Sequence, residues 1–172
     1  MIRLHNKLLT NLKREAVQKH ENLKRDWGED FYACIKDIAE HPVVLRMKLY
    51  PHHGKTNCYQ HCLHVAFYNY QWCRFMHLDA ISAARAGMLH DLFLYDWHTH
   101  AQKTGNRFHG LTHPKTAYQH ARKFFRLNSI ERDIILHHMW PVTLFHFPRT
   151  KEGWITTLTD KYCGLLESSR RK

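Results

Sequence analysis

The chain has 172 residues, enough for one domain with a substantial core but hardly for two. It carries 26 Lys and Arg against 15 Asp and Glu, a formal net charge of +11, so we expect anionic partners: nucleotides, nucleic acid or an acidic membrane surface. No apolar run approaches the roughly 20 residues that span a bilayer, and five cysteines without a C-x-x-C motif or a secretory leader indicate a reducing, cytoplasmic location.

Few glycines and prolines and the lack of an alternating strand pattern predict an all-α fold. The first expected element is an amphipathic helix in residues 2–17, where apolar residues recur at helical spacing among Lys and Arg. We expect it to pack on the domain; a basic face for membrane or nucleic acid is the alternative. A second helix is expected over 29–40, ending near His41 because the residue before Pro42 avoids the α region.

The next expected helices lie over 58–76 and 79–92, after a loop at 52–57. On the first, His61 and His64 are three residues apart and share a face, so both could look into one site. We interpret His64 as a core or supporting histidine. The second helix is rich in small residues, which let it approach its neighbours closely and bring His90 and Asp91, at its end, to the centre.

A long connection over 94–112 is expected to act as a lid or binding loop. It offers six possible substrate contacts: Asp96, His98, His100, Lys103, Arg107 and His109. Thr112 is expected to cap the next helix, with Pro114 in its first turn, which places His113 at a helix start. His109 is the rival of His113 as a metal ligand.

The last two expected helices carry further candidates. Ser129 is a candidate cap for a helix that ends at the doublet His137 and His138, with Glu131 and Arg132 on its exposed side. After a turn-rich passage over 145–153, a helix over 154–168 carries Asp160 and Lys161.

Imidazoles and carboxylates together favour borderline first-row metals such as iron, manganese, cobalt, nickel and zinc over magnesium or calcium. The candidates are five histidines and two aspartates, too many for one tetrahedral zinc. Two metal ions sharing a bridging carboxylate would use them all. These candidates are His61, His90, Asp91, His113, His137, His138 and Asp160.

The order of these residues and their contexts resemble the HD-domain superfamily of metal-dependent phosphohydrolases, in its two-metal version. The contexts are His-Cys-Leu-His-Val-Ala, Ala-Gly-Met-Leu-His-Asp-Leu-Phe, His-Pro-Lys-Thr-Ala and Leu-Thr-Asp-Lys-Tyr, within about 56–167. The resemblance implies one HD domain over 1–172, an all-α helical bundle of about six to seven helices: N-terminal helices and a loop over 1–55, then the metal-binding core over 56–167.

The resemblance also implies a division of ligands between two divalent ions about 3.5 to 4 Å apart. One ion would be held by His61, His90, Asp91 and Asp160, and the other by Asp91, His113, His137 and His138, with His90 and Asp91 as the catalytic pair.

The implied activity is hydrolysis of a phosphate mono- or diester of a nucleotide or other small metabolite through a metal-activated hydroxide. Candidate phosphate contacts are Lys55, Arg107, Lys115 and Lys161. Leu94 stands where many two-metal relatives have lysine, and no Gly-Tyr-Pro signature occurs, which argues against a cyclic dinucleotide substrate. Two alternatives remain: a diiron oxygenase of the same superfamily, and a non-catalytic module that binds nucleotides or nucleic acid. Nucleic acid is not favoured, and no membrane partner is expected.

Overall fold

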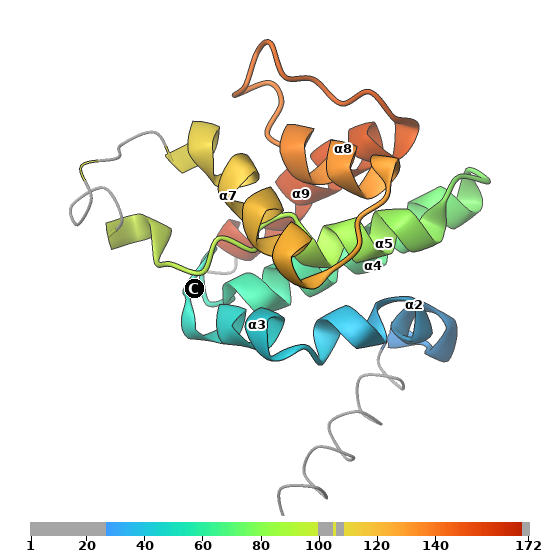
Figure 1. Cartoon of the computed structure of the whole chain (residues 1–172), viewed down its shortest axis with the longest axis horizontal. Coiled ribbons are helices and arrows are strands. Elements are labelled where there is room, and N and C mark those ends of the chain that lie inside the picture. The colour runs from blue at the N-terminus through green and yellow to red at the C-terminus, as the bar shows by residue number, and fades with distance from the viewer. Residues whose placement is uncertain (1–26, 100–104, 106–108, 170–172) are drawn as a thin grey trace, which may run out of the picture. The chain divides into compact units, whose positions relative to one another are not determined.

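The computed structural model describes residues 27–99, 105 and 109–169. The chain divides into two compact units, Met1–Ala33 and Cys34–Lys172. Within the described ranges all regular structure is helical except an isolated antiparallel bridge between Pro51 and Asn57, so the all-α prediction is confirmed (Figure 1). The helix predicted over 2–17 lies outside the described residues, as do His100, Lys103 and Arg107. A single domain over 1–172 stays a prediction.

Short helices lead into the second unit. Helix α2 covers Glu29–Ala39 and ends two residues before the predicted stop at His41 and Pro42. Helix α3, Pro42–Leu45, follows at once, with His41 as its N-cap: the imidazole Nδ1 accepts a hydrogen bond from the Val43 amide at 3.2 Å. The 3-10 helix η1 covers Arg46–Leu49.

Helices α4, Cys58–Phe75, and α5, Ala80–Leu89, lie side by side (Figure 1). A reciprocal capping box of Asn57 and Gln60 starts α4. The two helices come very close at Gly87, where an added Cβ would lie 2.7 Å from the Ala66 Cα. Small residues on α5 therefore set its distance from α4. Because α5 ends at Leu89, His90 and Asp91 lie just beyond the regular helix.

Helix α7, His109–Phe124, corrects one prediction. It begins three residues before Thr112, so Thr112 is not its cap and His113 lies inside the helix. Pro114 therefore also lies inside the helix and not at its start, and because proline has no amide hydrogen, the carbonyl of Gly110 lacks its regular helical donor.

Helix α8, Ser129–His137, is capped by Asn128, and Ser129 is its first residue, so the cap was predicted one residue too late. Asn128 and Glu131 form a capping box. Glu131 was predicted to be exposed, but it is buried and lies 3.0 Å from the Arg85 guanidinium. Helix α9, Lys151–Ser169, begins three residues earlier than predicted.

Within the second unit α4 packs on α5 and α9, α5 packs on α8, and α8 packs on α7 and α9 (Figure 1). This arrangement brings together the carboxyl ends of α5 and α8 and the buried faces of α4, α7 and α9, which carry most of the candidate ligands. Of the described helices, none has the length and apolar character needed to cross a membrane.

Candidate metal centre

Helices α4, α7 and α9, the residues that directly follow α5 and α8, and one loop bring seven side chains to one buried cluster. Six of the seven were predicted as ligands. The predicted six are His61, His90, Asp91, His113, His138 and Asp160, and the seventh is His52. All are buried except Asp160, which is partly exposed.

The carboxylate of Asp91 lies between two groups of ring nitrogens. Its Oδ1 lies 3.1 Å from His113 Nε2 and 3.6 Å from His138 Nε2. Its Oδ2 lies 3.6 Å from His90 Nε2. The nitrogens of His113 and His138 are themselves 3.0 Å apart. The two oxygens of Asp91 therefore face different sets of ligand atoms.

Asp160 completes the group on the His90 side. Its Oδ1 lies 3.0 Å from His61 Nε2 and 3.5 Å from His90 Nε2. Atoms that share an ion at metal–nitrogen distances of about 2.0 to 2.1 Å are roughly 3 to 3.5 Å apart. The spacings in both groups fit ligands of a common ion.

The orientation of the imidazole rings also fits metal binding. The carbonyl of Gly87 lies 2.8 Å from His90 Nδ1, and the carbonyl of Ile135 lies 3.0 Å from His138 Nδ1. A carbonyl can only accept a hydrogen bond, so Nδ1 carries a proton in both rings, and in the neutral imidazole Nε2 keeps its lone pair. In each ring that lone pair faces the centre.

His61 is oriented in the same way by an acid. Its Nδ1 lies 2.9 Å from Glu167 Oε2, while its Nε2 faces Asp160. A carboxylate behind a ligating histidine fixes the tautomer and raises the basicity of the ligand nitrogen.

Two buried atoms of the cluster show that hydrogen bonding alone does not account for it. His90 Nε2 and Asp91 Oδ1 have no hydrogen-bond partner within the described residues, although other ligand atoms lie 3.1 to 3.6 Å away. Burying a polar atom without a partner costs about 1 to 3 kcal/mol. A divalent cation bound here would satisfy both atoms, so the residues fit a metal centre.

Charge in the cluster is arranged for a cation. Burial alone would raise the pKa of Asp91, but the imidazoles of His90 and His113 hold it well below its usual range. Burial lowers the pKa of His138 to about 4, so its imidazole is neutral at neutral pH, the form that binds a metal. Burial also opposes charge on His61, yet Asp160 and Glu167 raise its pKa well above the ordinary value. A metal ion would compete with that proton.

Comparison with known proteins identifies the family. A family model described as HD domain matches residues 58–165, more than half of the chain. The chain belongs to the HD domain family. An HD domain suggests the superfamily of metal-dependent phosphohydrolases and implies that the chain binds divalent metal. Neither a search of curated proteins nor a search of solved structures found a match to the chain.

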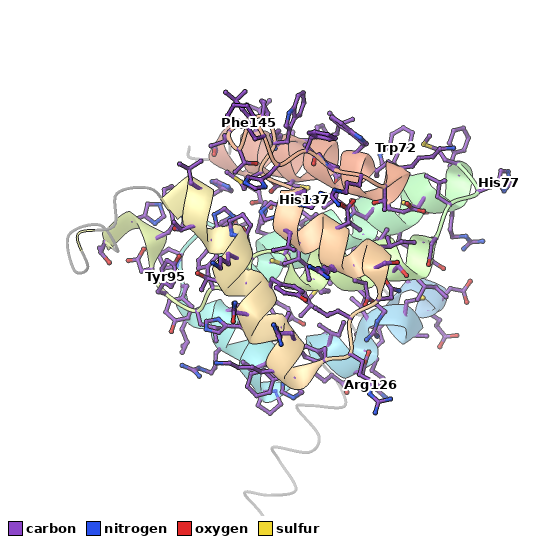
Figure 2. The ribbon with its side chains drawn as sticks, turned by 45° about the horizontal axis from the view of Figure 1, so that its top comes forward. Trp72, His77, Tyr95, Arg126, His137 and Phe145 are labelled. Carbon is purple, nitrogen blue, oxygen red and sulfur yellow. The ribbon has the colours of Figure 1, made fainter. Side chains whose placement is uncertain are left out.

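His137, the seventh predicted ligand, lies apart from the cluster. Among the described residues it belongs to no group of side chains whose ligand atoms are close enough together to share an ion. His137 ends α8 (Figure 2), and its Nδ1 lies 2.7 Å from Asp133 Oδ1. Asp133 also accepts hydrogen bonds from the amides of Arg149 and Thr150. The His137 ring stacks parallel to His146, with centroids 6.3 Å apart. Asp133 therefore ties α8 to the residues just before α9, and the His137 ring is held at Asp133, outside the groups of ligand atoms.

This difference within the doublet predicts unequal effects of substitution. If the wild type binds two divalent ions per chain, His138→Ala should bind about one, because Oδ1 of Asp91 and His113 lose their shared partner. His137→Ala should keep both ions and lose only stability. Elemental analysis of both purified variants, after circular dichroism has shown that they are folded, measures this. An ion lost from the His137 variant and retained by the His138 variant would reverse the assignment.

The predicted phosphate contacts lie at different places. Lys55 and Lys115 are exposed, and Arg107 lies outside the described residues. The Lys161 ammonium donates a hydrogen bond to the His138 carbonyl at 3.1 Å. Burial lowers the pKa of Lys161, opposed by Asp160 and Asp91. Among the described lysines predicted to bind phosphate, Lys161 is thus tied directly to a residue of the centre.

Sequence reasoning missed two residues of the HD domain's centre. Glu167 orients His61 and also lies 2.6 Å from His64 Nδ1. It is seven residues after Asp160 and hence on the same helix face, a spacing that could have revealed it. His52 precedes the matched region and belongs to no motif. Its only signal is the doublet with His53 in the loop before α4.

Proposed function

We propose that this HD domain uses two divalent transition-metal ions to hydrolyse a phosphate ester of a nucleotide or another small metabolite. The supporting observation is the placement of Asp91, whose Oδ1 faces His113 and His138 and whose Oδ2 faces His90. A carboxylate placed in this way can serve two ions at once.

The balance of charge supports an anionic substrate. Two divalent ions carry twice the charge of the two carboxylates, Asp91 and Asp160, so the loaded centre keeps a positive excess. The chain as a whole has a formal net charge of +11, which would attract a phosphate ester over a longer range. When bound, such a pair of ions supplies Lewis acidity and an activated water at neutral pH.

The side chains have separate roles in the proposal. Asp91, with His90 beside it, holds the two halves of the centre together, and His61 and Asp160 complete one half. His113 and His138 hold the other half. Lys161, whose ammonium lies at the His138 carbonyl, is the proposed contact for a phosphate oxygen. Lys55, Arg107 and Lys115 are proposed to guide the anion.

We expect the reaction to break the P–O bond of a phosphomonoester by attack of water on phosphorus. Carried out in oxygen-18 water, hydrolysis should therefore place one heavy oxygen in the released phosphate and none in the released alcohol, detected by mass spectrometry. The yield should be the same with and without dioxygen. Metal-stripped protein and the Asp91→Asn variant are the negative controls.

The same assay separates the alternatives. Turnover that requires dioxygen would move the protein to the diiron oxygenases. Protein that is loaded with metal and inert towards a panel of phosphomonoesters and diesters, yet binds duplex or single-stranded nucleic acid with a strong salt dependence, would be a binding module.

A further inference from the structure

His52 lies at the metal centre although it precedes the matched region of the chain. Its side chain is buried, with 7% of the residue exposed, and its Nε2 lies 3.3 Å from Asp91 Oδ2. Oδ2 is the oxygen that faces His90. The other ring nitrogen, Nδ1, is buried and has no hydrogen-bond partner in the described part of the chain.

The backbone fixes His52 independently of the cluster. The amide of His52 donates to the carbonyl of Thr56 at 3.0 Å, and the amide of Cys58 donates to the carbonyl of Tyr50 at 3.0 Å. The hydroxyl of Thr56 contacts the carbonyl of His53 and also lies 3.1 Å from Oε2 of Glu167, the acid that orients His61. The loop before α4 is thus closed on itself and anchored to α9, so His52 is held in place beside Asp91.

The orphaned Nδ1 indicates which tautomer His52 adopts. If Nε2 bound a metal ion directly, Nδ1 would carry the proton, and a buried N–H donor would have no acceptor. If Nε2 carries the proton, it donates a hydrogen bond to Asp91, and Nδ1 is then a hydrogen-bond acceptor without a donor. Orphaned buried N–H donors are rarer in proteins than under-used acceptors. The neighbouring rings, His53, His61, Phe93 and Trp97, surround the imidazole within 6.3 Å between centroids.

We infer that His52 is a positioning residue that donates its Nε2–H to Asp91 Oδ2 and holds the carboxylate so that its two oxygens face the two ions. The inference rests on the two-ion centre proposed above. A carboxylate oxygen has more than one lone pair, so Oδ2 accepts this hydrogen bond and still faces the ion on the His90 side. Without His52 the carboxylate is free to turn, and that ion loses affinity.

The test is a titration with Co²⁺ followed by its visible absorption, on metal-free wild type and three variants, with no substrate present. Glutamine places an amide N–H about where Nε2 of histidine lies, whereas asparagine is shorter and leucine has no donor. His52→Gln should bind both ions with affinities within about threefold of wild type. His52→Leu and His52→Asn should bind one ion about 10 to 100 times more weakly, with an altered absorption spectrum.

Each other outcome decides the question. Leucine and asparagine variants that bind two ions as tightly as wild type would overturn the inference. Loss of an ion from His52→Gln as well would make His52 a metal ligand and not a donor. If the leucine and asparagine variants do not fold, His52→Gln decides alone: retention of both ions supports the donor role. Wild type that binds fewer than two ions overturns the two-ion centre together with this role, whereas wild type that binds two ions and hydrolyses no ester overturns only the proposed function.

Discussion

Replacing Asp91 by alanine is expected to remove both metal ions and abolish hydrolysis. Asp91 is the one predicted ligand that has an oxygen in each half of the centre, 3.1 Å from His113 on one side and 3.6 Å from His90 on the other. Loss of a shared ligand weakens both sites, whereas loss of a ligand to one site weakens mainly that site. Elemental analysis should find two ions per chain in wild type, about one in His113→Ala and nearly none in Asp91→Ala.

A pair of histidines on α4 provides the matched control. His61 lies fully inside the cluster, whereas the side chain of His64, three residues later, is 29% exposed and bonds Glu167. His64→Ala should therefore keep much more metal than His61→Ala. Fully loaded wild type with no more than one ion per chain would rule out the shared role of Asp91. Greater loss of metal from the His64 variant than from the His61 variant would show that His64, and not His61, is the metal ligand on α4.

Gly87→Ala is expected to destabilise the protein although alanine favours helices. A methyl group at Gly87 would lie 2.7 Å from Ala66 Cα and 2.9 Å from Ala66 N, which are backbone atoms of α4 and cannot rotate away. Helix propensity would add up to about 1 kcal/mol to stability, whereas overpacking costs about 1 to 3 kcal/mol and sometimes more. We expect the clash to win and the free energy of unfolding to fall by about 2 kcal/mol. Metal affinity should fall too, because α4 carries His61 and the carbonyl of Gly87 orients His90.

Gly110→Ala on α7 is the control for this experiment. There a Cβ would meet only side-chain atoms, Met139 Cε at 3.5 Å and Val142 Cγ1 at 3.6 Å, which are ordinary contacts. Urea unfolding of the metal-free proteins should show that Gly87→Ala lowers the free energy of unfolding, whereas Gly110→Ala leaves it unchanged or raises it. Equal effects at the two glycines would mean that α4 and α5 are not held together by the close approach at Gly87.

The all-α fold and most of the cluster could be predicted from the sequence because the spacing of residues carries both. His61, His90, Asp91, His113 and Asp160 stand in ordered contexts, and the structure brings them together. The spacing of residues could not show which histidine of the doublet, His137 or His138, faces the cluster. Adjacent residues on a helix point about 100° apart, and His138 keeps helical backbone angles although α8 ends at His137, so the two rings point in different directions. Asp133, one turn before His137, decides which ring turns away from the cluster.

Other residues escaped prediction because their environment is set by distant parts of the chain. The cap of α8 is an exception: Asn128 and Ser129 are both good caps, but Glu131 stands three residues after Asn128, and this local capping-box spacing selects Asn128. Glu131 in turn is buried because Arg85, on another helix, pairs with it. His52 reaches Asp91 only through the closed loop before α4, which no local spacing indicates.

The wide separation of the cluster's residues along the chain has a consequence for folding. His61 and Asp160 are 99 residues apart in sequence, yet their side chains lie 3.0 Å from each other. An ion bound by both would close a loop of that length, and a cross-link over about 100 residues can remove roughly 4.7 kcal/mol of chain entropy from the unfolded state. Five cysteines lie in the described part of the chain and none forms a disulfide. In this protein a reversible cross-link by metal would take the place of a covalent one. A chelator would therefore lower its stability as a reductant lowers the stability of a disulfide-bonded protein. Free metal at 100 times the dissociation constant would raise the free energy of unfolding by about 2.7 kcal/mol.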